Sequence, residues 1–338
     1  MTTSPWRRPA AVLAAVVLVL GAASCAADVP EADPADDGAD ALRWTGPEVD
    51  LEGAELSVGS KESAEQELLG WITVEALRAA GADVHQEIGA GGTAVVREAQ
   101  RSGLIDGYWE YTGTGWTRIL AQAEPAGTPS ELYEDVRDRD GELNQIVWLP
   151  PAPASSSYAV AASGDTVEDL GIRTLADLAA AVEDDEPPPA LCVDEGTGFE
   201  DDLAGLRQFE RAFDVSVRPA ASLPTDELYE QVDAGLFCPF GQVIETDPRL
   251  ADGSLELLED AGTFTVHNPS FTLRQDVADD HPEVAEVVAA LSPLLTDEAV
   301  RSLRAEVELE GRDARSVARA WLEDTGLAEV PADDDEES

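Results

Sequence analysis

The hydrophobic pattern of residues 55–109 constrains the fold most strongly, because it switches repeatedly between strand and helix periods. The expected strands are residues 55–60, 84–88 and 104–109, and the expected helices between them are residues 62–80 and 93–103. Strands separated by helices predict right-handed crossovers and a mostly parallel sheet. In such sheets ligands bind beyond the carboxyl ends of the strands. The turn at Ser60–Lys61 and the segment 108–116 are therefore the candidate ligand-binding ends.

The second half of the chain predicts another α/β unit that is entered and left through extended segments. Prolines at 150–153 precede a restarted strand at 155–162, and residues 255–267 would form the return crossing. The other expected elements are helices at 174–183, 202–213, 225–234 and within 282–327, and strands at 190–193, 215–218 and 235–237. This order predicts two α/β lobes joined by two interdomain crossings, a hinged clamshell. The predicted boundaries are 54–153 and 264–330 for the first lobe, and 154–263 for the second.

The amino terminus has the features of an export signal. Arg7 and Arg8 precede an apolar run over residues 10–23, which is too short to span a bilayer comfortably. Ala23-Ser24-Cys25 resembles a bacterial lipobox, which predicts that residues 1–25 are a lipoprotein signal and that Cys25 is lipidated. Ordinary cleavage nearby, with an incidental cysteine, is the alternative. A lipidated chain would lie at the outer face of the cell membrane.

Two acidic segments flank the predicted lobes. Residues 26–53 are acidic and poor in apolar side chains, and residues 331–338 are mostly Asp and Glu. Such segments cannot bury enough apolar surface to order themselves. They are predicted to be a disordered tether and a solvated tail.

The formal net charge of −49 restricts the possible partners. Nucleic-acid binding depends on neutralising phosphates with basic residues, so this composition excludes it. The same charge repels anionic lipid headgroups and draws in cationic solutes.

Two cysteines remain after Cys25, and an even number in an exported chain favours a disulfide between Cys192 and Cys238. Both follow or lie in short apolar runs, so the bond would join neighbouring strands of one lobe. Three histidines without ligand spacing predict no metal site.

Residues 105–116 concentrate four of the chain's aromatic side chains beside two carboxylates and two threonines. Aromatic faces and carboxylates attract cations, although a buried strand whose aromatics form core would have the same composition. Lys61 is the only lysine among twenty arginines, and it follows the first predicted strand. A compact ammonium reaches point contacts that a planar guanidinium misses, whereas chance placement is the alternative.

Three motifs together resemble a known family. They are residues 58–66 (Val-Gly-Ser-Lys-Glu-Ser-Ala-Glu-Gln), Gly91-Gly-Thr93, and residues 103–114 with Glu-Tyr-Thr-Gly-Thr at their end. They resemble the substrate-binding lipoproteins of glycine betaine/choline ABC importers, over about residues 54–327. The resemblance implies a monomeric periplasmic-binding-protein fold of type II that closes on a quaternary ammonium compound. It also implies delivery to a membrane permease and its ATPase, with no catalysis and no cofactor.

The resemblance assigns the candidate ligand residues one by one. The positions that match the family are Lys61, Tyr111, Thr114 and Tyr158. The positions that depart from it are Ser156, Asp202, Ile244 and His267. Asp202 falls where the family has an arginine that clamps a carboxylate, which favours choline or another cationic osmolyte over glycine betaine; Arg207, one turn further on, is the alternative clamp.

Other functions have weaker support. The chain lacks the motif spacings of serine hydrolases and zinc proteases, which argues against an enzyme. The glycine-rich turn 89–93 at a helix start could hold an anion, although it lacks the P-loop lysine. A lipoprotein that keeps the fold but serves as a sensor or scaffold is the remaining alternative.

Overall fold

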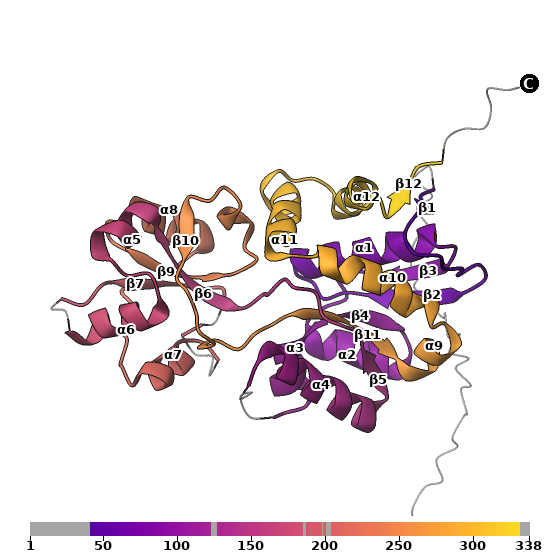
Figure 1. Cartoon of the computed structure of the whole chain (residues 1–338), viewed down its shortest axis with the longest axis horizontal. Coiled ribbons are helices and arrows are strands. Elements are labelled where there is room, and N and C mark those ends of the chain that lie inside the picture. Colours follow the sequence, from indigo (N-terminus) through magenta and orange to yellow (C-terminus); the bar gives the residue numbers. More distant parts are fainter. Residues whose placement is uncertain (1–40, 123–126, 185–186, 198, 201–203, 332–338) are drawn as a thin grey trace, which may run out of the picture. The chain divides into compact units, whose positions relative to one another are not determined.

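The computed structural model describes residues 41–122, 127–184, 187–197, 199–200 and 204–331. The first of its two five-stranded sheets has the order β3-β2-β4-β11-β5 (Figure 1). Its strands are β2 (Glu55–Gly59), β3 (Asp83–Glu87), β4 (Gly107–Tyr111), β5 (Ile146–Trp148) and β11 (Pro269–Arg274). β2 pairs in parallel with β3 and β4, whereas β11 runs antiparallel to β4 and β5. The return crossing therefore inserts a reversed strand, and the sheet is mixed.

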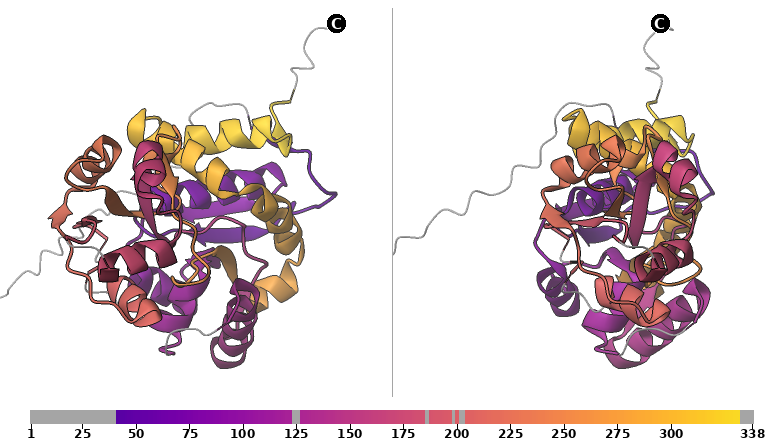
Figure 2. Two further views of the ribbon diagram at one scale, coloured as in Figure 1. Left: turned by 60° about the vertical axis from the view of Figure 1, so that its left-hand side comes forward. Right: turned by 90° about the vertical axis from the view of Figure 1, so that its left-hand side faces the viewer.

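Helix α1 (Ala64–Ala79) forms the centre of the first core. Most of its residues between Glu65 and Leu77 are buried, and Leu68, Leu69 and Ile72 are almost completely so. The helix ends before Gly81, whose φ of +103° few other residues tolerate. α1 packs against α10 (Glu283–Leu291), α11 (Asp297–Arg304) and α12 (Ala314–Asp324), as the yellow helices beside it in Figures 1 and 2 show. The C-terminal helices thus return to the first lobe.

Further helical segments belong to this lobe. Helix α2 (Thr93–Ser102) leads into β4, and α4 (Pro129–Asn144) leads into β5. Thr128 and Glu131 form a reciprocal capping box at the start of α4. After β4 the chain continues directly into the short α3 (Thr112–Thr114) and the π-helix η1 (Gly115–Ile119). The remaining elements are α9 (Gln275–Asp280), η3 (Ser292–Leu294) and η4 (Ala305–Leu309).

The second sheet has the order β10-β6-β9-β7-β8. Its strands are β6 (Tyr158–Ser163), β7 (Leu191–Asp194), β8 (Ala221–Leu223), β9 (Phe240–Ile244) and β10 (Leu255–Leu257). Its helices are α5 (Gly164–Leu170), α6 (Leu175–Asp184), α7 (Leu206–Phe213) and α8 (Thr225–Ala234), and η2 (Pro248–Leu250) follows β9. Two α/β sheets with the chain passing twice between them confirm the predicted fold class.

The disulfide between Cys192 and Cys238 is confirmed. Cys192 lies in β7, and Cys238 lies two residues before β9, the parallel neighbour of β7. Both cysteines are fully buried, so the bond ties the start of β9 into the core of the second lobe.

Two predicted strands are wrong. Residues 215–218 are irregular, and β8 begins only at Ala221, because Pro219 has no N–H to donate to a ladder. Residues 235–237 form a turn: Gly235 has a φ of +63°, and Leu236 is 88% exposed. The strand follows Cys238 rather than preceding it.

The predicted disordered tether, residues 26–53, includes residues that belong to the folded first lobe. β1 (Arg43–Trp44) pairs with β12 (Ala328–Glu329), and Leu42 and Leu51 are buried in the first core. This part of the acidic segment is ordered because β1 pairs with β12 and its few apolar side chains are buried. Cys25 and residues 26–40 lie outside the described residues, as do residues 332–338 of the tail.

We expect the double variant Cys192→Ala/Cys238→Ala to unfold more easily than the oxidised wild type. The bond closes a loop with a sequence separation of 46 residues. Loss of such a cross-link lowers the free energy of unfolding by about 2–5 kcal/mol. Urea unfolding would measure the change, and the reduced wild type serves as the control. Equal midpoints for all three forms would show that the bond does not stabilise the fold.

Candidate functional site

Lys61 lies just beyond the end of β2 and is 8% exposed. Its Nζ donates a hydrogen bond of 2.6 Å to Oε1 of Glu110, and it lies 4.3 Å from the centroid of the Tyr111 ring. An ammonium at this distance from a ring face is attracted by the negative charge of the π-system. The sole lysine of the chain therefore contacts the segment 105–116, where the carboxylate of Glu110 and the ring of Tyr111 hold it together.

Glu110 is fully buried on β4. Besides Lys61, it accepts hydrogen bonds from the Tyr108 hydroxyl (3.0 Å) and the Tyr111 N–H (2.7 Å). Burial, and after it the charge of Glu110, raises the pKa of Tyr108 well above its usual value. The ion pair is thus enclosed by a neutral phenol, a ring and the backbone.

Tyr111 forms the other side of this arrangement. Its hydroxyl donates a 2.6 Å hydrogen bond to Oε1 of Glu65, at the start of α1. Burial, followed by the charge of Glu65, raises the pKa of Tyr111 well above the normal range. The neutral phenol donates, and the short bond fixes the ring.

Glu65 also connects the first lobe to the second. Its Oε2 accepts from the hydroxyl of Thr246 at 2.6 Å and from Nη1 of Arg304 at 3.1 Å. The same Arg304 nitrogen donates to the Thr246 carbonyl at 2.8 Å. Thr246 follows β9 of the second sheet, and Arg304 ends α11. One buried carboxylate therefore joins both lobes to the Tyr111 ring.

Arg304 keeps its charge in this buried position. Burial alone would disfavour the guanidinium, but Glu65 and then Glu308 raise its pKa. Arg301, one turn earlier on α11, donates through Nε to the Glu245 carbonyl at 2.5 Å. Two arginines of one helix thus bind consecutive carbonyls of the second lobe.

His267 and Ser156, two positions where the chain differs from the family pattern, lie in this same cluster together with Thr114. Oγ1 of Thr114 is 3.4 Å from Nδ1 of His267, whose ring lies edge-on to Tyr111 with 6.5 Å between centroids. The Ser156 N–H donates to the His267 carbonyl, and the hydroxyl oxygens of Ser156 and Thr246 are 3.5 Å apart. The return crossing therefore reaches Tyr111 through His267, and the first crossing contacts His267 and Thr246 through Ser156.

Tyr158 and Ile244 lie opposite each other on β6 and β9. The Tyr158 hydroxyl donates to the Thr197 carbonyl at 3.1 Å. Its ring contacts Phe199 and Phe264 edge-on, at centroid distances of 5.1 and 6.3 Å. These residues form a separate aromatic group in the second lobe, and Ile244 is two residues from Thr246.

Asp202 lies outside the described residues. Arg207, the alternative clamp, is exposed on α7 and lines a pocket of about 660 Å³ with Arg211 and Arg218. The arginine that the structure brings to the Tyr111 cluster is Arg304, which no motif in the sequence indicates.

Glu65, Thr246 and Arg304 belong to the candidate site but were not among the residues predicted from the sequence. Glu65 lies in the same motif as Lys61, residues 58–66. That motif could therefore have indicated Glu65 as a candidate site residue as well. Thr246 and Arg304 are 181 and 239 residues away from Glu65 and carry no local motif.

Comparison with known proteins identifies the family. The model of the substrate-binding domain of ABC-type glycine betaine transport systems (OpuAC) matches residues 54–324. The chain belongs to this family. The resemblance predicted from the three motifs is therefore confirmed.

Relatives and a solved structure agree with this assignment. The chain is 30% identical over 289 residues to the glycine betaine-binding protein YehZ of Escherichia coli, covering 80% of this chain and 90% of the relative. It is 29% identical over 263 residues to the chemotactic signal transduction substrate-binding protein CosB of Halobacterium salinarum, covering 71% and 74%. The structure of apo YehZ superposes with a TM-score of 0.69 at 28% identity, covering 81% of this chain and 99% of YehZ. In the described part of this chain, none of the helices has the length and apolar character needed to cross a bilayer.

Glu245 precedes Thr246 in the contact between the lobes. Its carboxyl group should make the free energy of unfolding depend on pH. Burial raises the pKa of Glu245 from 4.5 to about 7, and the charges of Asp297 and Asp260 add to the rise. The hydrogen bond from Ser155 and the charge of Arg301 act in the opposite direction. The folded state then binds a proton that the unfolded state has released, so stability falls as pH rises from about 4.5 through 7.

We expect Glu245→Gln to remove this contribution. With an allowance for solvent screening, the wild type should lose about 1–2 kcal/mol relative to the variant between pH 5 and pH 8. Urea unfolding across this range would measure the difference. Glu230→Gln, at an exposed position on α8, is the control and should follow the wild type. Parallel pH profiles for Glu245→Gln and the wild type would contradict the raised pKa.

Proposed function

We propose that this protein is the extracytoplasmic solute-binding component of an ABC importer, and that it captures a quaternary ammonium or other small cationic osmolyte. It would deliver the solute to a membrane permease driven by an ATPase subunit, acting as a monomer anchored through lipidated Cys25. Family membership and the relatives named for glycine betaine support the class of solute. The negative surface would concentrate cations near the site.

The observation that carries the proposal is the ammonium of Lys61 on the face of Tyr111, 4.3 Å from its centroid. Two buried carboxylates accept hydrogen bonds from Tyr111, Glu65 from its hydroxyl and Glu110 from its backbone N–H. The surroundings of Tyr111 thus stabilise a positive charge within the protein itself. A trimethylammonium group has no N–H to donate, so aromatic faces and nearby carboxylates are the groups suited to bind it.

The charges of the cluster bear on which solute fits. Lys61 is paired with Glu110, and Arg304 is paired with Glu65. A ligand carboxylate would have to compete with these buried pairs, and Asp202 replaces the arginine that the family uses as a clamp. A solute without a carboxylate, such as choline, therefore fits this proposal better than glycine betaine.

We expect calorimetry to show binding of at least one of choline, glycine betaine and carnitine, with choline the tightest. Tyr111→Ala should weaken that binding by at least 10-fold, because each cation–π contact contributes about 0.5–2 kcal/mol and Glu65 also loses its donor. Tyr111→Phe keeps the ring and should retain most of the affinity. Tyr133→Ala, on α4, is the control away from the site. Unchanged affinity in Tyr111→Ala, or no binding of any of the three solutes by the wild type, would refute the cation site.

A sensing role is the second candidate, and one relative favours it. CosB is named as a component of a chemotactic signal transduction system. A solute-binding protein of this fold can present its ligand-bound form to a receptor instead of a permease. Loss of choline uptake in cells lacking the gene would support import, whereas loss of chemotaxis with normal uptake would support sensing.

A further inference from the structure

The half-buried ring of His267 lies where the return crossing meets the Tyr111 cluster. It is edge-on to the Tyr111 ring, with 6.5 Å between centroids, and its Nδ1 is 3.4 Å from the hydroxyl oxygen of Thr114. The ring also lies against Gly113, where an added Cβ would come within 2.8 Å of Cε1 and 2.9 Å of Nε2. A side chain at position 113 would displace the imidazole, so this glycine keeps the ring beside Tyr111.

The backbone of His267 joins the two crossing segments. Its N–H donates to the hydroxyl of Ser157 at 2.9 Å, and its carbonyl accepts from the N–H of Ser156 at 3.1 Å. The neighbouring Asn268 side chain donates to the Ala154 carbonyl at 2.8 Å. The imidazole is therefore positioned by both segments that connect the lobes, and its place beside Tyr111 depends on both.

The charged side chains of this cluster come from four elements of the first lobe. Lys61 follows β2 and pairs with Glu110 on β4, and Arg304 ends α11 and pairs with Glu65 at the start of α1. These four groups carry two positive and two negative charges. Protonation of His267 adds one positive charge to this set.

An imidazole is the side chain whose charge ordinarily changes between pH 5 and pH 8. When it is neutral, the His267 ring provides an aromatic edge beside the Tyr111 ring and no charge. When it is protonated, the imidazolium repels a cation bound at Tyr111 and competes with it for the negative face of the phenol ring. The two protonation states therefore differ in how well they tolerate a cationic solute.

We propose that His267 makes solute capture depend on pH: the neutral imidazole permits a small quaternary ammonium solute to bind beside Tyr111, and protonation of the imidazole disfavours it. The inference rests on the proposed function and assigns a specificity-determining residue to the same site. The sign follows from linkage, because a solute that binds the neutral form better releases a proton when it binds. The affinity therefore rises with pH between about 5 and 8.

Glu245 titrates in the same range, because burial raises its pKa to about 7. Its effect on binding has the opposite sign. If closing of the lobes buries this carboxyl group, closure takes up a proton, and low pH then favours the bound form. The direction of the pH dependence therefore distinguishes His267 from Glu245.

The test measures choline binding by calorimetry at pH 5.5 and pH 7.5, at constant ionic strength, since choline itself has no group that titrates in this range. The wild type should bind choline about 10-fold more tightly at pH 7.5. Paired buffers of different ionisation enthalpy should show release of protons on binding near pH 6.5. His267→Gln and His267→Phe, which remove the titrating group, should each bind with nearly the same affinity at both pH values.

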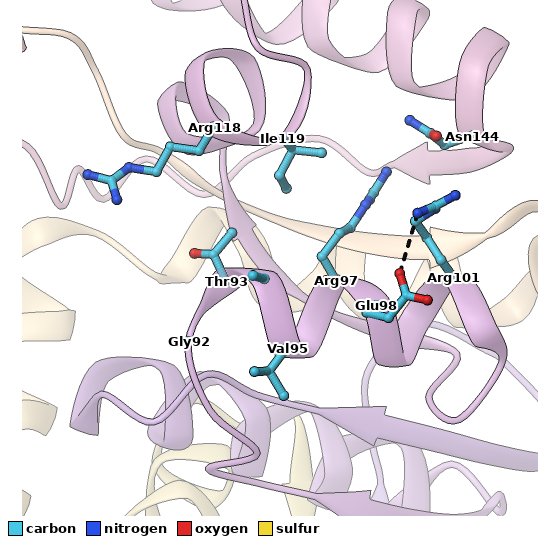
Figure 3. A pocket seen from close by; sticks show the side chains of 10 residues that line it. Gly92, Thr93, Val95, Arg97, Glu98, Arg101, Arg118, Ile119 and Asn144 are labelled. Carbon is cyan, nitrogen blue, oxygen red and sulfur yellow. Dashed lines mark hydrogen bonds and ion pairs between the residues drawn. The ribbon is translucent and has the colours of Figure 1, made fainter.

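Three control variants should keep the pH dependence of the wild type. Glu245→Gln removes the competing carboxyl group. His85→Gln removes an exposed histidine that pairs with Glu87 on β3. Arg101→Gln removes a cation that pairs with Glu98 in a different part of the first lobe, at the pocket of about 610 Å³ shown in Figure 3, whose lining residues include none of the Tyr111 cluster.

Each outcome decides the proposal. Equal affinity at both pH values, tighter binding at pH 5.5, or an unchanged pH dependence in a folded His267→Gln variant overturns the role of His267 and leaves the proposed function standing. Where neither His267 variant folds, the proton release of the wild type decides, and uptake of protons or no exchange overturns the role. If choline, glycine betaine and carnitine all fail to bind at either pH, the proposed function is refuted, and this inference with it.

Discussion

The buried carboxylate of Glu65 is the interaction on which the arrangement of the site depends. An ionised group removed from water is strongly destabilising unless charge and hydrogen bonds compensate it. Tyr111, Thr246 and Arg304 supply that compensation from β4, from the segment after β9 and from α11. Removing any one of the three would leave a buried acceptor or charge without its partner. The glutamate therefore fixes the relative positions of three segments that are distant in the sequence.

This constraint has a direct consequence for binding. The Tyr111 ring is held at its hydroxyl by Glu65 and at its face by Lys61, so its orientation is set before any ligand arrives. A preorganised ring loses little conformational entropy on binding. Because Thr246 and Arg304 share the same carboxylate, a change at the ring also alters a contact between the lobes. A solute bound at Tyr111, as proposed, would therefore also act on the contact between the lobes.

The sequence predicted the fold well where local pattern determines structure. The strand–helix alternation placed β2, α1 and β3 within a residue or two, because their apolar spacing and the glycine after α1 act locally. It failed at residues 215–218 and 235–237, where a proline and a left-handed glycine override short apolar runs. Lys61, Tyr111 and Thr114 were found through motifs. Thr246 and Arg304 were not, because only the packing of α11 against the second lobe gives them a role.

Arginine and lysine pair with buried carboxylates in different surroundings, and the shape of each cation suits its place. Glu75, 2% exposed on α1, accepts from Arg78, Arg315 and Arg319 at 2.8–3.2 Å and so ties α1 to α12. A branched, planar guanidinium suits such a shared carboxylate, because several donors reach it from different helices. At Lys61 the cation must instead sit on a ring face while one donor reaches Glu110. A compact ammonium meets both requirements in a space where a guanidinium would have to stack on the ring or pair with the acid. The single lysine therefore stands where the aromatic face, and not only the carboxylate, determines the geometry.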